Sequence, residues 1–107
     1  MPTVKEILAD LPRRFDPESA RGVKAVIQYR ISGPRGGSFH ALVRDGRLEV
    51  REGAHPFPDL TLSMSDEDCV EIATGKLSDQ MAFMSGRLRI AGDMGLAVRM
   101  PSLLRMS

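Results

Sequence analysis

Residues 23–32 carry the feature that most limits how this chain can fold, because apolar and polar side chains largely alternate along the segment. A period of two residues is typical of a strand that is buried on one face only. Residues 38–52 repeat the pattern, and the Asp45-Gly46 dipeptide within them favours a two-residue hairpin turn. Together with a further alternating segment at residues 59–65, the sequence predicts four strands in succession.

One helix is predicted before these strands. Thr3 and Glu6 have the spacing of a capping box, in which each side chain accepts a hydrogen bond from the backbone of the other residue. Apolar residues then recur on one face, so we expect a helix over residues 3–11 that Pro12 ends.

Three helices and a fifth strand are predicted after residue 65. Ser65, Ser78 and Asp93 each precede a stretch with helical periodicity and are expected to cap a helix start. Residues 87–91 alternate between the last two of these helices and predict the strand. Pro101 lies within the final helix, which should kink or restart there because proline lacks a backbone N–H.

This order of elements predicts an α+β fold. We expect a mostly antiparallel five-stranded sheet, with helices packed on one face and a polar, wet face on the other. A length of 107 residues suits one hydrophobic core, so residues 1–107 are expected to form a single domain.

Composition and charge indicate where such a chain works. The formal net charge of +1 does not indicate a nucleic acid partner, and the single Cys69 fits a reducing compartment. No apolar run approaches the roughly 20 residues that span a bilayer, and the first residues lack the features of a secretory signal. We therefore expect a soluble, cytoplasmic protein.

No set of side chains has the spacing of a catalytic or metal site. His40 and His55 have no cysteine or carboxylate at ligand spacing. Cys69 falls on the apolar side of a predicted helix, which favours a buried structural thiol over a nucleophile. Acidic residues 66–68 are interpreted as stabilising a helix start. The sequence therefore predicts no enzyme activity, no metal and no cofactor.

Methionine gathers near the end of the chain. Apart from Met1, five of the six methionines lie in the last quarter of the sequence: Met81, Met84, Met94, Met100 and Met106. Methionine side chains are flexible and polarizable, so they fill irregular cores and also suit surfaces that adapt to different apolar guests. The pattern alone leaves both interpretations open.

The segment from Thr74 to Met100 resembles the signature of the sterol carrier protein 2 (SCP2) domain family. The matching parts are Gly75-Lys76-Leu77, Ala82-Phe83-Met84 with Gly86, Leu88-Arg89-Ile90, and Gly92-Asp93-Met94-Gly95-Leu96-Ala97. The resemblance, to a small stand-alone member of bacterial type, implies a five-stranded α+β domain whose helices enclose an apolar tunnel.

The same resemblance implies non-catalytic binding of lipids such as fatty acids, fatty acyl-CoA or sterol-like molecules, and their transfer or presentation. We expect the ligand-binding wall of the tunnel to comprise Phe57, Leu77, Gln80, Met81, Phe83, Met84, Leu88, Ile90, Met94, Leu96, Ala97, Met100, Leu103 and Leu104. Gln80 would offer a polar contact to a headgroup near the mouth, and the final helix would loosen at Pro101 to admit the guest.

An alternative function belongs to another class. The chain could be an accessory or scaffold module that docks on an enzyme of lipid, steroid or quinone metabolism. Binding of apolar ligands by the isolated protein would separate the two hypotheses. A transient contact with a membrane or an enzyme is expected in either case.

Arginines alternate with apolar residues in two predicted strands. Arg47 and Arg51 in one strand, and Arg87 and Arg89 in the other, should project from the polar face of the sheet. The simpler interpretation is a solvated face with cross-strand ion pairs. The alternative is a weak docking surface for anionic headgroups or for the phosphates of acyl-CoA. Nucleic acid is disfavoured because no stacking aromatic residues accompany these arginines.

Overall fold

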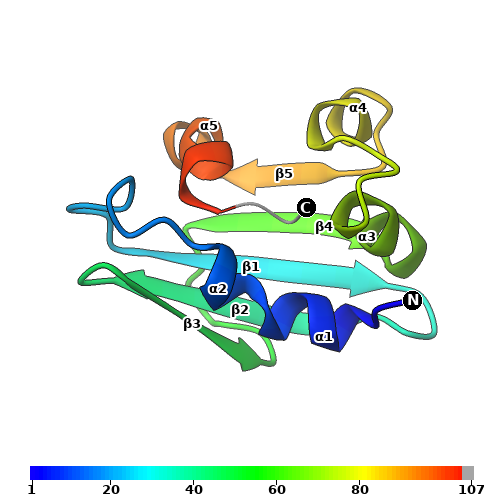
Figure 1. Ribbon diagram of the computed structural model, residues 1–107, viewed down its shortest axis with the longest axis horizontal. Helices are drawn as coiled ribbons and strands as arrows, with labels where there is room; N and C mark the ends of the chain where they lie inside the picture. Colours follow the sequence, from blue (N-terminus) through cyan, green and yellow to red (C-terminus); the bar gives the residue numbers. More distant parts are fainter. Residues whose placement is uncertain (105–107) are drawn as a thin grey trace.

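The computed structural model describes residues 1–104 and arranges them around one sheet (Figure 1). The strands are β1 (Ala25–Ser32), β2 (Gly37–Arg44), β3 (Arg47–Glu52), β4 (Leu60–Ser65) and β5 (Arg89–Gly92), and the helices are α1 (Val4–Ala9), α2 (Leu11–Arg14), α3 (Asp66–Ala73), α4 (Asp79–Met84) and α5 (Met94–Leu103). Met106, one of the clustered methionines, lies outside the described residues.

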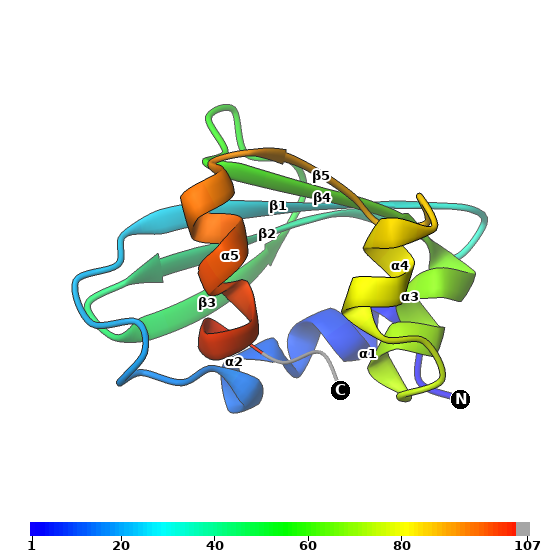
Figure 2. The same cartoon turned by 90° about the horizontal axis from the view of Figure 1, so that it is seen from above.

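The five strands are ordered β3-β2-β1-β4-β5. The β1–β2, β2–β3 and β4–β5 pairs are antiparallel, whereas β1 and β4 at the centre are parallel. Figure 2 shows that the helices lie on one side of this sheet. The predicted α+β class, with a mostly antiparallel five-stranded sheet and helices on one face, is confirmed.

The alternating sequence gives the sheet one apolar face. Side chains of this face are buried under the helices: Ala25, Ile27, Tyr29 and Ile31 on β1, Phe39, Ala41 and Val43 on β2, and Leu60, Leu62 and Met64 on β4. They form one hydrophobic cluster with residues of α1, α3 and α5 such as Leu8, Ile72 and Leu103. Their burial supplies the main driving force for folding.

The opposite face is only partly wet, which corrects the prediction. Strands β3 and β4 both run parallel to β1, so residues 53–59 must return across the sheet between them. This return segment lies on the outer face, where the His55 N–H donates to Gln28 Oε1 (2.7 Å) and His40 Nδ1 donates to the Gly53 carbonyl (2.9 Å). Gln28 and His40 are therefore buried, although the alternation along residues 23–32 places Gln28 on the polar face.

The first helix ends earlier than predicted. The capping box forms as expected, with Thr3 Oγ1 accepting from the Glu6 N–H (3.1 Å) and Glu6 Oε1 accepting from the Thr3 N–H (2.9 Å). However, α1 stops at Ala9, and Pro12 does not end a helix but lies in the first turn of α2. Proline is tolerated there because first-turn N–H groups have no partner within the helix.

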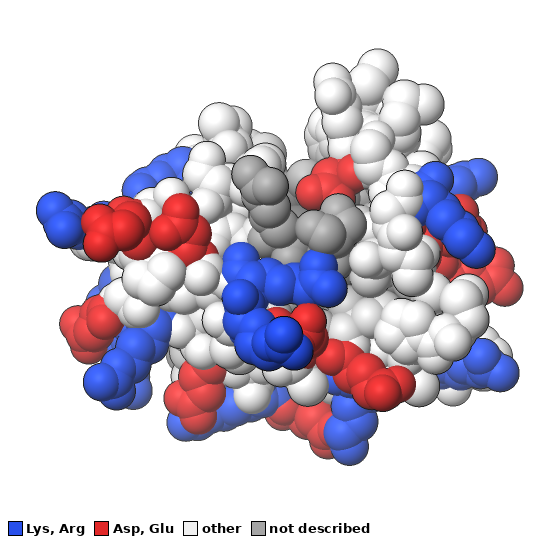
Figure 3. All heavy atoms as spheres, in the orientation of Figure 1, with Lys and Arg blue, Asp and Glu red and all other residues white. Residues whose placement is uncertain are grey.

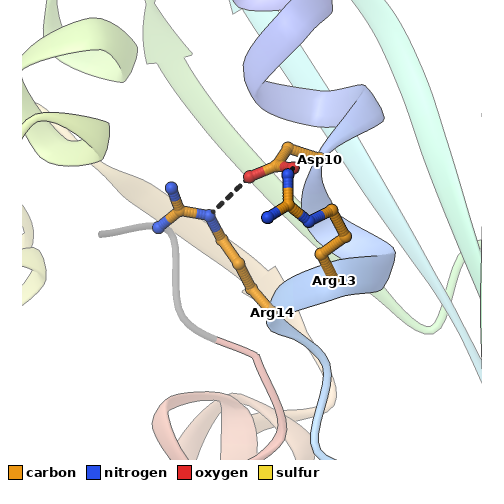
Figure 4. A network of polar contacts seen from close by, with 3 residues as sticks. All are labelled: Asp10, Arg13 and Arg14. Carbon is orange, nitrogen blue, oxygen red and sulfur yellow. Dashed lines mark hydrogen bonds and ion pairs between the residues drawn. The ribbon is translucent and has the colours of Figure 1, made fainter.

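Asp10 holds the junction between α1 and α2. Its carboxylate accepts a hydrogen bond from Arg14 Nε (3.0 Å), drawn in Figure 4, and another from Arg13 Nη1 (3.2 Å). The hydrogen bond from Arg14, with the positive charges of both arginines, holds the pKa of Asp10 below its usual value. The ion pairs are exposed, so they orient the junction more than they stabilise the fold.

The final helix does not restart at Pro101, contrary to one of the two expected outcomes. α5 runs continuously from Met94 to Leu103 with Pro101 inside it. Only its last turn is affected by the missing N–H, and that end is fixed from outside the helix. The Asp16 N–H donates to the Leu103 carbonyl (2.9 Å), and Phe15 and Leu104 form an isolated antiparallel bridge.

The buried amide of Gln28 gives a stability prediction. Its Oε1 accepts from His55 and its Nε2 donates to the Phe39 carbonyl (2.9 Å), so Gln28→Met would remove both buried hydrogen bonds. We expect the free energy of unfolding to fall by about 2 kcal/mol, measured by urea denaturation. Arg44→Gln, an exposed change on the next strand, is the control and should shift stability by less than about 0.5 kcal/mol. Equal effects of the two changes would contradict the role of Gln28.

Candidate functional site

A cavity of about 680 Å³ lies between the apolar face of the sheet and helices α3, α4 and α5. Its lining is mostly apolar and comprises Tyr29, Leu62, Met64, Ile72, Gly75, Leu77, Ser78, Asp79, Gln80, Phe83, Leu88, Ile90, Ala97, Met100, Pro101 and Leu104. Figure 3 shows that the surface over α4, at the upper right, projects from the body of the molecule and is largely uncharged.

Local hydrogen bonds hold the two helices that border the cavity. Ser78 Oγ accepts from the Met81 N–H (3.1 Å) at the start of α4, and Asp93 Oδ1 accepts from the Leu96 N–H (3.1 Å) at the start of α5. Both predicted N-caps are confirmed. Ala82 is the buried residue of α4, and its carbonyl accepts from the Leu88 N–H (2.9 Å). A small residue here lets α4 lie close to the chain that enters β5.

Gly92 is needed where β5 passes into α5. Its φ is +113°, and a Cβ atom at this position would lie 2.4 Å from the Asp59 carbonyl oxygen. The same carbonyl accepts from the Asp93 N–H (2.8 Å). Only glycine allows this close approach, which places the capped start of α5 beside the start of β4.

Eight of the fourteen residues predicted for the ligand-binding wall line the cavity. They are Leu77, Gln80, Phe83, Leu88, Ile90, Ala97, Met100 and Leu104. They come from α4, β5, α5 and the segments beside them, so the structure brings together side chains that the C-terminal signature contains.

The other six residues lie elsewhere. Leu96 and Leu103 are buried in the hydrophobic cluster, whereas Met81, Met84 and Met94 have half or more of their surface exposed. Phe57 is 81% exposed and belongs to the return segment on the opposite face of the sheet. The described part of the methionine cluster is therefore divided, with Met100 in the cavity lining and Met81, Met84 and Met94 at the surface.

Sequence reasoning missed the part of the lining that the central strands supply. Tyr29 on β1 and Leu62 on β4 were not predicted, and they stand beside the predicted Ile90 on β5, because the register pairs Tyr29 with Leu62 and Leu62 with Ile90. The alternation had already assigned each of them to the inner face. The missing information was the pairing of β1 with β4 and of β4 with β5, which brings these strands together at the cavity.

The Tyr29 hydroxyl is buried and has no hydrogen-bond partner among residues 1–104. Burial raises the pKa of this hydroxyl above its usual value, and the negative charges that Cys69 and Asp79 can carry add to the rise. Burial also raises the pKa of the Cys69 thiol to about 11. A protonated, buried thiol is a poor nucleophile, so the geometry does not favour covalent chemistry at Cys69.

The polar groups of the cavity lie together at the start of α4. Ser78, Asp79 and Gln80 are exposed and follow one another in the chain, while the rest of the lining is mostly apolar. Such an arrangement suits a guest with a long apolar part and a polar end. No group of three metal-ligating side chains, and no helix able to cross a membrane, occurs within residues 1–104.

A family model and two curated relatives each match most of this chain. The model of the SCP-2 sterol transfer family matches residues 4–105. Hydroxysteroid dehydrogenase-like protein 2 of Danio rerio is 32% identical over 104 residues, which cover 96% of this chain and 25% of that protein. Sterol carrier protein 2 of Rattus norvegicus is 30% identical over 103 residues, covering 91% of this chain and 19% of that protein. The chain thus spans a quarter or less of the length of these two relatives.

One solved structure of similar fold is that of a palmitated protein. The solution NMR structure of palmitated SCP2L2 from Aedes aegypti matches with a TM-score of 0.74 and 28% identity, over 92% of this chain and 90% of that one. The likeness therefore extends over nearly the full length of both chains.

The buried hydroxyl of Tyr29 leads to a prediction at alkaline pH. Because the pKa is raised in the folded state, the unfolded chain loses this proton first, near pH 10. Ionisation of this group therefore leaves the free energy of unfolding unchanged below about pH 10 and lowers it as the pH rises further. The chain has one tyrosine and no tryptophan, so an absorbance titration follows Tyr29 alone. We expect phenolate near pH 10 in urea and only at higher pH in the folded protein.

Tyr29→Phe is the matched variant for this experiment. It removes the hydroxyl, which has no partner among residues 1–104, and keeps the ring. It should therefore raise the free energy of unfolding at pH 7 by about 1 kcal/mol and reduce the loss of stability above pH 10. A loss of stability at pH 7 would show instead that the hydroxyl is hydrogen-bonded in the folded protein.

Proposed function

Since this chain belongs to the SCP-2 sterol transfer family, we propose that it binds a lipid in the cavity beside α4 and α5 and transfers or presents it without catalysis of its own. The ligand is a fatty acid, a fatty acyl-CoA or a sterol-like molecule. Residues 1–107 act as one lipid-binding domain in the cytoplasm. The observation that carries the proposal is the apolar cavity itself, which is lined largely by residues of the family signature.

The size of the cavity suits such a guest. Its volume of about 680 Å³ falls within the range of about 300–1,000 Å³ that is usual for small-molecule sites. Burial of about twelve methylene groups at ~0.8 kcal/mol each would contribute roughly 10 kcal/mol. Association and ordering cost about 4–15 kcal/mol, which leaves at most about 6 kcal/mol and a dissociation constant of tens of micromolar or weaker.

The eight lining residues predicted from the sequence form the proposed wall, together with Tyr29, Leu62, Met64 and Ile72 at its base. Gln80 is the proposed contact for a polar headgroup, because its amide can both donate and accept a hydrogen bond and is exposed at the mouth. Met81 and Met84 are exposed on the same helix, and their flexible side chains can adapt to guests of different shape.

The accessory role stays as the second candidate, and the lengths of the relatives favour it. Both curated relatives are at least four times as long as the matched region, and one is named a hydroxysteroid dehydrogenase-like protein. In this role the domain would present a bound lipid to an enzyme, either within a longer chain or as a separate partner. The two functions share the cavity and differ in what receives the ligand.

Two neighbouring residues of α5 allow a direct test of the cavity. Ala97 lines it, whereas Val98 is 80% exposed and does not. Ala97→Trp should fill the cavity and weaken lipid binding about tenfold or more, the cost of losing two or more buried methylene contacts. Val98→Trp adds the same ring to the surface and should bind as the wild type does.

Native mass spectrometry with palmitate, palmitoyl-CoA and cholesterol measures this difference. We expect one-to-one adducts for the wild type and for Val98→Trp, and their loss for Ala97→Trp. Unchanged adducts in both variants would place lipid binding outside the cavity. A complete lack of adducts in the wild type would remove the proposal that the isolated domain binds these lipids.

Exchange of the ligand is proposed to involve the last turn of α5. Pro101 lines the cavity and cannot donate a hydrogen bond to the Ala97 carbonyl, so this turn is weaker than the rest of the helix. Pro101→Ala should restore the bond and slow the transfer of a fluorescent fatty acid between vesicles, with little change in affinity. Pro34→Ala, in an exposed turn, is the control. An unchanged transfer rate for Pro101→Ala would contradict this exchange route.

A further inference from the structure

A second cleft, of about 590 Å³, lies beside the outer face of the sheet and shares one described lining residue, Met64, with the proposed lipid cavity. Three arginines line it, Arg30, Arg87 and Arg89, together with four serines. The proposed lipid function leaves this cleft without a role, and its chemistry differs from that of the apolar cavity.

Strand register places the central side chains of this cleft in one row. Arg30 on β1 pairs with Ser63 on β4, and Ser63 pairs with Arg89 on β5. All three side chains point to the outer face, because their neighbours Tyr29, Leu62 and Ile90 point inward. Adjacent strands are about 4.8 Å apart, so the backbone positions of Arg30 and Arg89 are about 10 Å apart, with Ser63 between them.

The positive charges of this row are not neutralised within the described chain. Among residues 1–104, Arg30, Arg87 and Arg89 form no ion pair, whereas Arg13, Arg21 and Arg51 have carboxylate partners. The Ser63 hydroxyl likewise donates to no described residue. Asp68 is the one acidic residue of the described lining, and it lies beyond ion-pair distance of the arginines. Three like charges around one cleft repel each other unless an anion lies between them.

We propose that the row of Arg30, Ser63 and Arg89, with Arg87 beside it, binds a phosphate group. Guanidinium groups match the oxygens of a phosphate with paired, charge-assisted hydrogen bonds, and a serine hydroxyl donates one more. The phosphate belongs either to a soluble compound or to the headgroup of a membrane lipid. This site is independent of the proposed lipid cavity, because the side chains that form it point to the other face of the sheet.

Inorganic phosphate is the probe for the first arm of the test. Titration of the isotope-labelled protein, followed by NMR at constant ionic strength, should give saturable shifts at the Ser63 amide and the Arg30 and Arg89 side chains. Arg89→Gln should weaken phosphate binding about tenfold, and Asp68→Asn should strengthen it by removing a repelling charge. Arg47→Gln makes the same charge change on β3, outside the cleft, and should alter the affinity by less than about twofold.

Vesicles form the second arm and identify the source of the phosphate. Co-sedimentation with vesicles of phosphatidylcholine containing phosphatidic acid, but not with phosphatidylcholine alone, would assign the site to a membrane lipid if Arg89→Gln abolishes it. Saturable phosphate binding without vesicle binding would assign it to a soluble phosphate compound.

Two results would overturn the proposal. One is the absence of saturable shifts with phosphate together with no vesicle binding that depends on Arg89. The other is an equal loss of binding in Arg89→Gln and Arg47→Gln, which would show that only the net charge matters. Native mass spectrometry of lipid adducts on the same variants tests the proposed lipid function separately. Failure of the phosphate proposal therefore leaves the lipid proposal to be decided by its own measurement.

Discussion

Strands β1 and β4 pair in parallel at the centre of the sheet, and most other elements take their place from that pairing. Asp59 fixes its start: the backbone N–H donates to the Val26 carbonyl (2.9 Å), and the carboxylate accepts from the Val26 N–H (2.7 Å). The carbonyl of Asp59 then accepts from Asp93 and so positions α5. One residue thus ties the central strands to the helix that borders the cavity, and the parallel direction forces residues 53–59 across the outer face.

The same pairing gives β1, β4 and β5 two chemically different faces. Tyr29, Leu62 and Ile90 form an apolar row at the cavity, and the next row along these strands carries Arg30, Ser63 and Arg89 toward solvent. Because side chains of a strand alternate, a slip of one residue in register would exchange the two rows. Burial of the apolar row therefore fixes the register, and the register in turn gathers the arginines that the further site requires.

Local signals in the sequence predicted much of this fold. Alternation identified the strands, Asp45-Gly46 the hairpin, and Ser78 and Asp93 the helix starts that border the cavity, because each depends on residues close together in the chain. Features that depend on distant contacts were missed or misassigned. The burial of Gln28 and His40 results from the return segment, and nothing in their own strands indicates it.

The candidate site was predictable to the extent that the C-terminal signature contains it. Leu88, Ile90 and Ala97 were found because they belong to that signature, and they do line the cavity. Met81 and Met84 lie in the same segment and were placed in the wall because methionine suits an adaptable apolar surface. The short helix α4 buries only Ala82, so their side chains remain at the surface. Residue type indicated an adaptable apolar region, but helix length and packing decided which side chains face inward.

The cavity and the Tyr29 hydroxyl share one physical consequence. Walls of an apolar space that no guest fills forfeit contacts with each other. A buried hydroxyl such as that of Tyr29, which has no partner among residues 1–104, costs about 1–3 kcal/mol. The free energy of unfolding of a chain of this size is only about 5–15 kcal/mol, and both features lower it. A guest that fills the space restores the lost contacts. At a free concentration of about one hundred times its dissociation constant, it adds about 2.7 kcal/mol to the free energy of unfolding. If the cavity binds lipid, the unliganded state is therefore the less stable of the two, and the strength of packing around β5 and α5 depends on the ligand as well as on the sequence.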